Sequence, residues 1–107
     1  MPYTIEELRS KIVPIAIAHG VESVSLFGSY AKGLATADSD VDLKIEKGKI
    51  RTLFQLSDFR LAVEDALKRP VDLVTDSSSD RAFLNMIAKE EVLLYRNGAS
   101  PLESYFD

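Results

Sequence analysis

Residues 26–45 of the chain, LFGSYAKGLATADSDVDLKI, decide the fold and carry its most informative polar residues. Gly28 and Ser29 come first, and Asp40 and Asp42 follow after ten intervening residues, with Val41 between them. From Asp40 onward polar and apolar residues alternate, which predicts a strand with one buried face. Both carboxylates then project from the same face, with their Cα atoms about 6–7 Å apart by the strand rise.

Two like charges side by side are costly to bury, because each carboxylate disfavours ionisation of the other. They are tolerated at a strand end that faces a cleft, where a divalent cation neutralises both. Carboxylate oxygens are hard ligands that suit magnesium or manganese. Asp40 and Asp42 are therefore predicted to bind Mg²⁺, with Mn²⁺ as an alternative.

The upstream half of the stretch suggests a phosphate site. Apolar residues alternate with two serines, so residues 24–27 are predicted to form a strand that ends at Gly28. Glycine lets the backbone approach a ligand without a Cβ in the way. Residues 29–32 are expected to open a short helix with Ser29 near its N-cap. Free N–H groups at a helix start favour a phosphate, so this turn is predicted to cradle one.

The whole pattern, G-S-x10-D-x-D, resembles the signature of the DNA polymerase beta-type nucleotidyltransferase superfamily. The segment FGSYAKGLATADSDVDL is similar in particular to the minimal nucleotidyltransferases, or MNT proteins. The resemblance implies a small α/β fold, a magnesium–nucleoside triphosphate, and transfer of a nucleoside monophosphate to an acceptor. Lys32 stands where the family motif usually has arginine, which keeps the charge but loses the planar fork. The likeness extends more loosely over residues 1–96.

A third carboxylate is expected from the second half of the chain. Residues 50–68 have the apolar periodicity of a helix, and residues 71–74 predict a short strand that Asp72 interrupts. The superfamily takes a third carboxylate from a strand that follows a helix, so the resemblance implies this role for Asp72. It would bind one metal ion and accept the proton of the acceptor hydroxyl. The alternative is an edge aspartate that is hydrogen-bonded to a nearby N–H.

The remaining pattern completes the expected fold. Thr4 and Glu7 form a capping box for a helix that Gly20 ends, and Pro14 is expected to kink or split it. Further expected elements are a loop over residues 76–80, a helix over residues 80–90, a strand over residues 92–95 and a tail over residues 99–107. The predicted fold class is α/β (α+β): one domain over residues 1–107, with a mixed, mostly antiparallel sheet of about four strands and helices on one face.

Composition narrows the class of protein. The 107 residues have a net charge of −4, which argues against broad electrostatic binding of nucleic acid. The absence of cysteine fits the cytoplasm and excludes disulfide or thiol chemistry. No apolar run approaches the length of a membrane span, and no signal peptide is expected. His19, the only histidine, lacks a nearby partner in sequence, so no catalytic role is expected for it.

The resemblance also implies a division of labour among the candidate residues. The catalytic and metal-binding residues that it implies are Asp40, Asp42 and Asp72. The residues that it implies for the nucleotide are Gly28, Ser29 and Lys32. Two Mg²⁺ ions and ATP are expected, with one ion activating the attacking oxygen and the other stabilising the leaving pyrophosphate.

The acceptor is expected to be held by another chain or by a second copy, because about sixty residues follow the motif and the fold uses them. The MNT resemblance implies a HEPN-domain RNase toxin as partner, and AMP transfer to its hydroxyl groups as the way in which this antitoxin neutralises it. Two alternatives stay open. One is a non-catalytic antitoxin that masks the toxin by contact, and the other is an enzyme that nucleotidylates a small molecule.

Overall fold

The computed structural model describes residues 2–75 and 80–98. Helices and strands follow one another as the sequence predicts, with ends that differ by a few residues. They are α1 (Ile5–His19), β1 (Ser23–Phe27), α2 (Gly28–Lys32), β2 (Val41–Glu46), α3 (Leu53–Leu67), β3 (Val71–Thr75), α4 (Arg81–Ala88) and β4 (Val92–Arg96). The tail predicted at residues 99–107 and the first four residues, 76–79, of the loop predicted at residues 76–80 lie outside the described residues.

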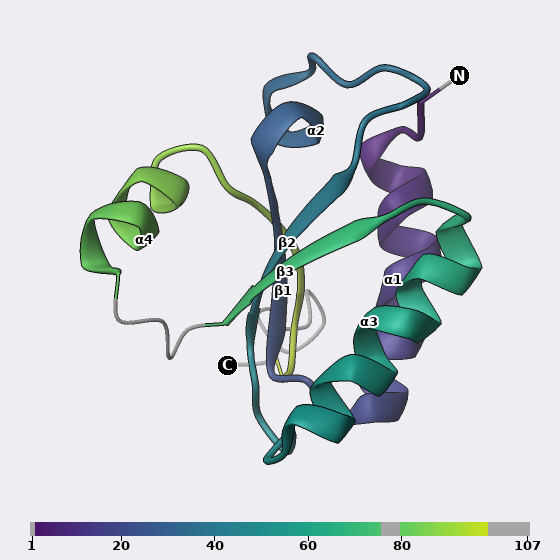
Figure 1. The fold of residues 1–107 in the computed structure, drawn as a ribbon, viewed down its shortest axis with the longest axis vertical. Helices are drawn as coiled ribbons and strands as arrows, with labels where there is room; N and C mark the ends of the chain where they lie inside the picture. The colour runs from purple at the N-terminus through teal and green to yellow at the C-terminus, as the bar shows by residue number, and fades with distance from the viewer. Residues whose placement is uncertain (1, 76–79, 99–107) are drawn as a thin grey trace, which may run out of the picture.

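The four strands form one sheet in the order β3-β2-β1-β4 (Figure 1). Strand β1 pairs antiparallel with β2 and with β4, while β2 and β3 run parallel. The predicted mixed, mostly antiparallel sheet is therefore confirmed. The parallel register of β2 and β3 sets Asp42 level with Asp72, so residues 30 positions apart in the chain become neighbours on adjacent strands.

One face of the sheet carries the core. Val41, Leu43 and Ile45 of β2 are fully buried, whereas the residues that alternate with them are only half-buried. Helices α1 and α3 pack against each other and cover this face (Figure 1). Between them, the rings of His19 and Phe59 meet edge to face with centroids 5.7 Å apart. The half-buried His19 side chain thus packs against α3.

Helix α4 departs from the expectation that helices cover one face. It lies on the opposite side of the sheet from α1 and α3 (Figure 1). Its Phe83 meets Phe27 edge to face, with ring centroids 6.1 Å apart. Phe27 follows buried Leu26 on β1, so it projects from the face that α1 and α3 leave free. This short helix packs on the sheet with Phe83 against Phe27 and with Ile87 buried, a placement that periodicity alone does not reveal.

The ends of α1 agree with the sequence prediction. Thr4 and Glu7 form the capping box, and Gly20 ends the helix in the left-handed region with φ of 72°. The prediction that Pro14 could split the helix is wrong, because α1 runs unbroken through it. None of the helices in the described part of the chain has the length and apolar character needed to cross a membrane.

Candidate active site

Asp42 and Asp72 form the centre of the candidate site. They are paired in register on β2 and β3. Burial raises the pKa of Asp42 to about 6, helped by the charge of Asp72, by hydrogen bonding with that carboxyl group and by the charge of Asp40. Two carboxyl groups this close favour a proton or a cation beside them, because either one neutralises part of their combined negative charge.

Asp40 lies beside this pair but not within the strand. Strand β2 begins at Val41, so the prediction that Asp40 opens the strand is wrong by one residue. Its side chain is exposed and acts on Asp42 through its charge. Within residues 2–75 and 80–98, no three His, Cys, Asp or Glu side chains are grouped closely enough to hold an ion as they stand. The structure thus brings Asp42 and Asp72 together, and the exposed side chain of Asp40 lies beside them.

Gly28 closes the other side of the site. The chain turns there from β1 into α2 with φ of 71°, a conformation that residues with a Cβ rarely adopt. A Cβ at this position would lie 2.2 Å from Oδ2 of Asp42. Glycine is therefore required for two reasons, and the backbone of this turn lies against the carboxylate of Asp42.

The start of α2 differs from the predicted cap. The helix begins at Gly28, and Phe27 occupies the N-cap position without any side-chain cap hydrogen bond. The N-cap position therefore lies two residues before Ser29, and the predicted cap is displaced by that much. Ser29 lies in the first turn and is half-buried. Phenylalanine cannot cap the turn, so among the described residues no N-cap side chain occupies its first backbone N–H groups, which a phosphate could then accept from.

Two lysines border the site, and each has a carboxylate partner that the sequence did not suggest. Lys32 Nζ lies 3.4 Å from Glu90, and Lys44 Nζ lies 3.0 Å from Glu91. The two glutamates follow α4 and precede β4, so they join this connection to α2 and β2. Charge order along the chain offers no signal for pairs so distant in sequence. The cationic side chain predicted for the nucleotide, Lys32, is therefore engaged with Glu90.

Tyr30, also within the motif, belongs to the core. Its side chain is 4% exposed and packs in the main hydrophobic cluster. Its hydroxyl has no hydrogen-bond partner among the described residues. Of the two roles open from the sequence, lining the cleft or packing in the core, the structure favours the second.

The donors present suit a hard divalent cation. Asp42 and Asp72 offer carboxylate oxygens on adjacent strands, with Asp40 next to them, and these are oxygen ligands of the kind that magnesium prefers. Burial, and after it the charges of Asp72 and Asp40, raises the pKa of Asp42, so this carboxyl group favours a neutralising partner such as a cation. The glycine turn leaves room for the backbone, and not a side chain, to approach a ligand at this point.

The chain is similar in sequence to several known proteins. The polymerase beta, nucleotidyltransferase family matches residues 10–99. A Methanocaldococcus jannaschii protein that is provisionally named a protein adenylyltransferase is 35% identical over 88 residues, which cover 82% of this chain and 95% of that protein. The protein adenylyltransferase MntA of Thermococcus cleftensis is 33% identical over 97 residues, covering 83% and 94%.

A solved structure shares the fold. It is the MNT antitoxin of Shewanella oneidensis in complex with its tri-AMPylated HEPN toxin, with a TM-score of 0.68 and 16% identity. The match covers 96% of this chain and 79% of that one. At this identity the likeness bears on the fold alone, whereas the family match spans most of the chain. The family match, together with the Gly-Ser turn that lies against the paired aspartates, shows that the chain belongs to the polymerase beta nucleotidyltransferase family.

Proposed function

We propose that this chain is a protein adenylyltransferase that transfers AMP from Mg-ATP to a hydroxyl group of a HEPN-domain toxin, and so acts as its antitoxin. The observation that carries the proposal is the pairing of Asp42 with Asp72 against the Gly28 turn. Its substrate class is supported by relatives named as protein adenylyltransferases, which match more than four-fifths of the chain. The nature of the partner is supported by the AMPylated HEPN toxin in the structurally similar complex.

Asp40, Asp42 and Asp72 would hold the metal, with two Mg²⁺ ions expected and Mn²⁺ as an alternative. When bound, the ions neutralise charge on the triphosphate and on the leaving pyrophosphate. For Asp40 to join, its exposed side chain turns toward the pair, which its position beside β2 allows. The cation takes the place of the proton that Asp42 otherwise retains to about pH 6.

Asp72 is well placed to act on the acceptor. It is the exposed member of the pair and lies on the edge strand β3, where another protein can approach. As general base it would take the proton of the acceptor hydroxyl. The hydroxyl oxygen then forms its bond to the α-phosphorus, and the bond to the pyrophosphate oxygen breaks. Gly28 and Ser29 would hold the phosphates with their backbone N–H groups during this transfer.

Lys32 would offset negative charge on the phosphates. It lies at the end of α2 and about half of its side chain is exposed, so it can move from Glu90 to a phosphate at little cost. In this move Lys32 exchanges the Glu90 carboxylate for a phosphate group, which carries more negative charge. Binding of ATP is thereby coupled to release of one contact between α2 and the connection that follows α4.

The test is to incubate the protein and a HEPN toxin with Mg-ATP, separate them, and measure the intact mass and RNase activity of the toxin. We expect a mass gain in AMP units and a loss of RNase activity that persists after separation. Asp42→Asn is the matched control, since it keeps the fold and should leave the toxin unmodified. A toxin that stays unmodified and recovers its activity on separation favours a masking antitoxin instead. Transfer of AMP only to a small molecule favours the other alternative.

A further inference from the structure

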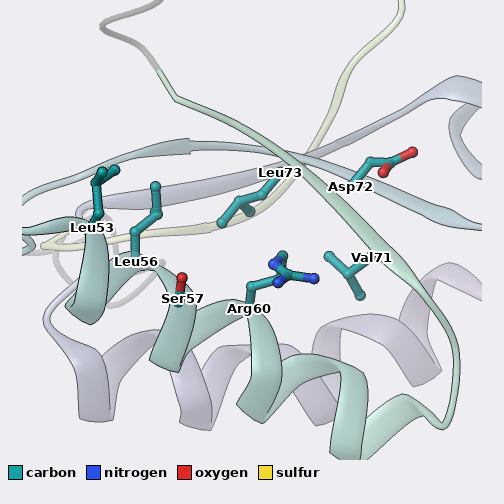
Figure 2. A pocket seen from close by; sticks show the side chains of 7 residues that line it. All are labelled: Leu53, Leu56, Ser57, Arg60, Val71, Asp72 and Leu73. Atoms are coloured by element: carbon teal, nitrogen blue, oxygen red, sulfur yellow. The ribbon is translucent and has the colours of Figure 1, made fainter.

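A groove at the edge of the sheet includes Asp72 in its lining. It has a volume of about 300 Å³ and lies between α3 and β3 (Figure 2). Its walls include Leu53, Leu56 and Arg60 from α3, and Val71, Asp72 and Leu73 from β3. In Figure 2, Val71 and Leu73 point toward α3, whereas the Asp72 carboxylate projects to the other side of the strand. The groove therefore adjoins the candidate active site without being part of it.

The backbone along this groove offers unpaired hydrogen-bonding groups. Strand β3 has β2 on one side and is the last strand of the sheet on the other. Val41 N donates to Pro70 O at 3.0 Å, so Pro70 and Asp72 direct their backbone groups toward β2. In a strand the intervening residues, Val71 and Leu73, direct theirs outward.

One outward group is already satisfied. Val71 N donates to Oε2 of Glu64 at 2.9 Å, which confirms the direction in which that residue points. The Val71 carbonyl and both backbone groups of Leu73 have no such bond within the part of the chain that the structure describes. Three consecutive outward groups are thus available to a further strand.

We propose that this edge and groove bind an extended segment of the acceptor protein, which adds to β3 as a fifth strand and brings its hydroxyl residue beside Asp72. The inference rests on the proposed adenylyltransferase function, because it concerns how the acceptor reaches the site. Main-chain hydrogen bonds of this kind give affinity, and pockets for alternate side chains give specificity. Neighbouring strands are separated by about 5 Å, which brings a paired side chain within reach of the carboxylate.

The alternation of side chains specifies the class of segment. A residue level with Asp72 projects on the same face as that carboxylate, so it can be the serine or tyrosine that receives AMP. Its two neighbours then project into the groove. One lies level with Leu73, where Leu53 and Leu56 form an apolar wall, and the other lies near Arg60 (Figure 2). The expected segment therefore has a hydroxyl residue between an apolar residue and an acidic one.

Arg60 has the capacity to bind that acidic residue. Its Nη1 lies 3.4 Å from both carboxylate oxygens of Glu64, a long contact near the limit of hydrogen bonding. About two-fifths of the Arg60 side chain is exposed, and Glu64 is also held by the Val71 N–H. A guanidinium has further donors in its fixed fork, so it can bind a second carboxylate without leaving the first.

The first experiment measures binding without nucleotide, so that it does not depend on transfer. A short fluorescent peptide with a central tyrosine between leucine and aspartate, made in both orders, is titrated with the protein and followed by anisotropy. We expect one order to bind, and Arg60→Glu to weaken it about tenfold or more, which corresponds to about 1.4 kcal/mol. Replacing the peptide aspartate by lysine should restore binding to that variant. Lys11→Glu, an equal change of charge at an exposed position of α1, should have no effect.

The second experiment isolates the backbone pairing. Leu73→Pro removes the outward N–H but none of the hydrogen bonds to β2, which an edge strand tolerates. Leu73→Ala removes the apolar side chain and keeps the N–H. We expect the proline variant to lose peptide binding and the alanine variant to retain part of it, with melting curves confirming that both fold.

Failure of either proposal is distinguishable. Equal binding by both Leu73 variants, together with no effect of Arg60→Glu, overturns the edge-strand proposal, as does AMP transfer to a toxin when neither peptide binds. Peptide binding that follows the expected pattern without any AMP transfer overturns the proposed function and leaves β3 as a docking edge.

Discussion

The backbone of Gly28 lies against the carboxylate of Asp42, so closely that a Cβ on residue 28 would stand 2.2 Å from Oδ2. This contact joins the two halves of the motif, which are separated in sequence by the α2 helix and a loop. It means that the turn proposed for phosphate and the carboxylate proposed for metal are parts of one rigid arrangement. A substitution in the Gly28 turn is therefore expected to affect the Asp42 carboxylate, and a substitution of Asp42 is expected to affect the turn.

Gly28→Ala is expected to destabilise the protein more than Gly33→Ala. Both glycines have positive φ, of 71° and 74°, which costs about 1–3 kcal/mol for a residue with a Cβ. Only Gly28 adds a clash, because nothing lies within 4 Å of a Cβ at Gly33. The difference in urea unfolding free energy between the two variants measures the contact with Asp42.

The same pair of variants tests the nucleotide site. Binding of Mg-ATP, measured by calorimetry on folded protein, should weaken for Gly28→Ala and stay unchanged for Gly33→Ala. Equal affinities would mean that Gly28 serves only the fold, and the role of Ser29 beside it would then need another basis.

Asp42 should make the metal-free protein less stable as pH rises. Folding raises the pKa of this group from 3.8 to about 6, so the folded state favours the protonated form. Its stabilising effect is full below the unfolded pKa and is lost as pH rises through the folded pKa. Relative to Asp42→Asn, the wild-type protein should lose stability between about pH 4 and pH 6.5.

Thermal unfolding of both proteins across this range, without divalent cations, provides the measurement. Adding Mg²⁺ at neutral pH should recover stability for wild type and not for Asp42→Asn, because a neutral amide is a poor ligand for a hard cation. Parallel pH curves for the two proteins would contradict a raised pKa at this position.

Glu90→Gln is expected to tighten binding of Mg-ATP. If Lys32 leaves Glu90 to reach a phosphate, removing the carboxylate removes the competition. An exposed ion pair is worth about 0.2–1 kcal/mol, so the gain should be at most about fivefold. Lys32→Ala should weaken binding and abolish the effect of Glu90→Gln in the double variant. Additive effects of the two changes would exclude competition between Glu90 and phosphate for Lys32.

The sequence predicts those features of the site that neighbouring residues determine, and not those that depend on contacts between distant parts of the chain. Alternation from Asp40 onward predicted that Asp42 lies on the face of its strand opposite the core. The apolar run over residues 71–74 predicted the strand that carries Asp72. Both patterns are local in sequence. The N-cap predicted near Ser29 lies two residues earlier, at Phe27, because the chain turns into the helix through a positive φ at Gly28 that side-chain capping preferences do not predict.

Other features depend on how the elements pack and could not be predicted from local patterns. The parallel register that sets Asp42 level with Asp72 arises from the whole crossover through α3. The position of α4 involves contacts between residues far apart in sequence, such as the ring pair of Phe27 and Phe83. The groove beside Arg60 exists only once β3 is the edge of the sheet and α3 lies next to it.

Asp72→Asn should separate transfer from nucleotide binding. Asp72 is exposed on the edge strand, and in the proposed function it accepts the proton of the acceptor hydroxyl. An amide cannot take that proton, and loss of a general base costs about 10²–10⁴ in rate. The variant should therefore keep most of its affinity for Mg-ATP, through Asp40 and Asp42, while AMP transfer falls by at least a hundredfold.

Calorimetry with Mg-ATP and single-turnover transfer to the acceptor measure the two quantities, with Asp42→Asn as the comparison that should lose both. A variant that loses ATP binding as completely as Asp42→Asn would assign Asp72 to the metal alone, and the proton would have to leave by another route.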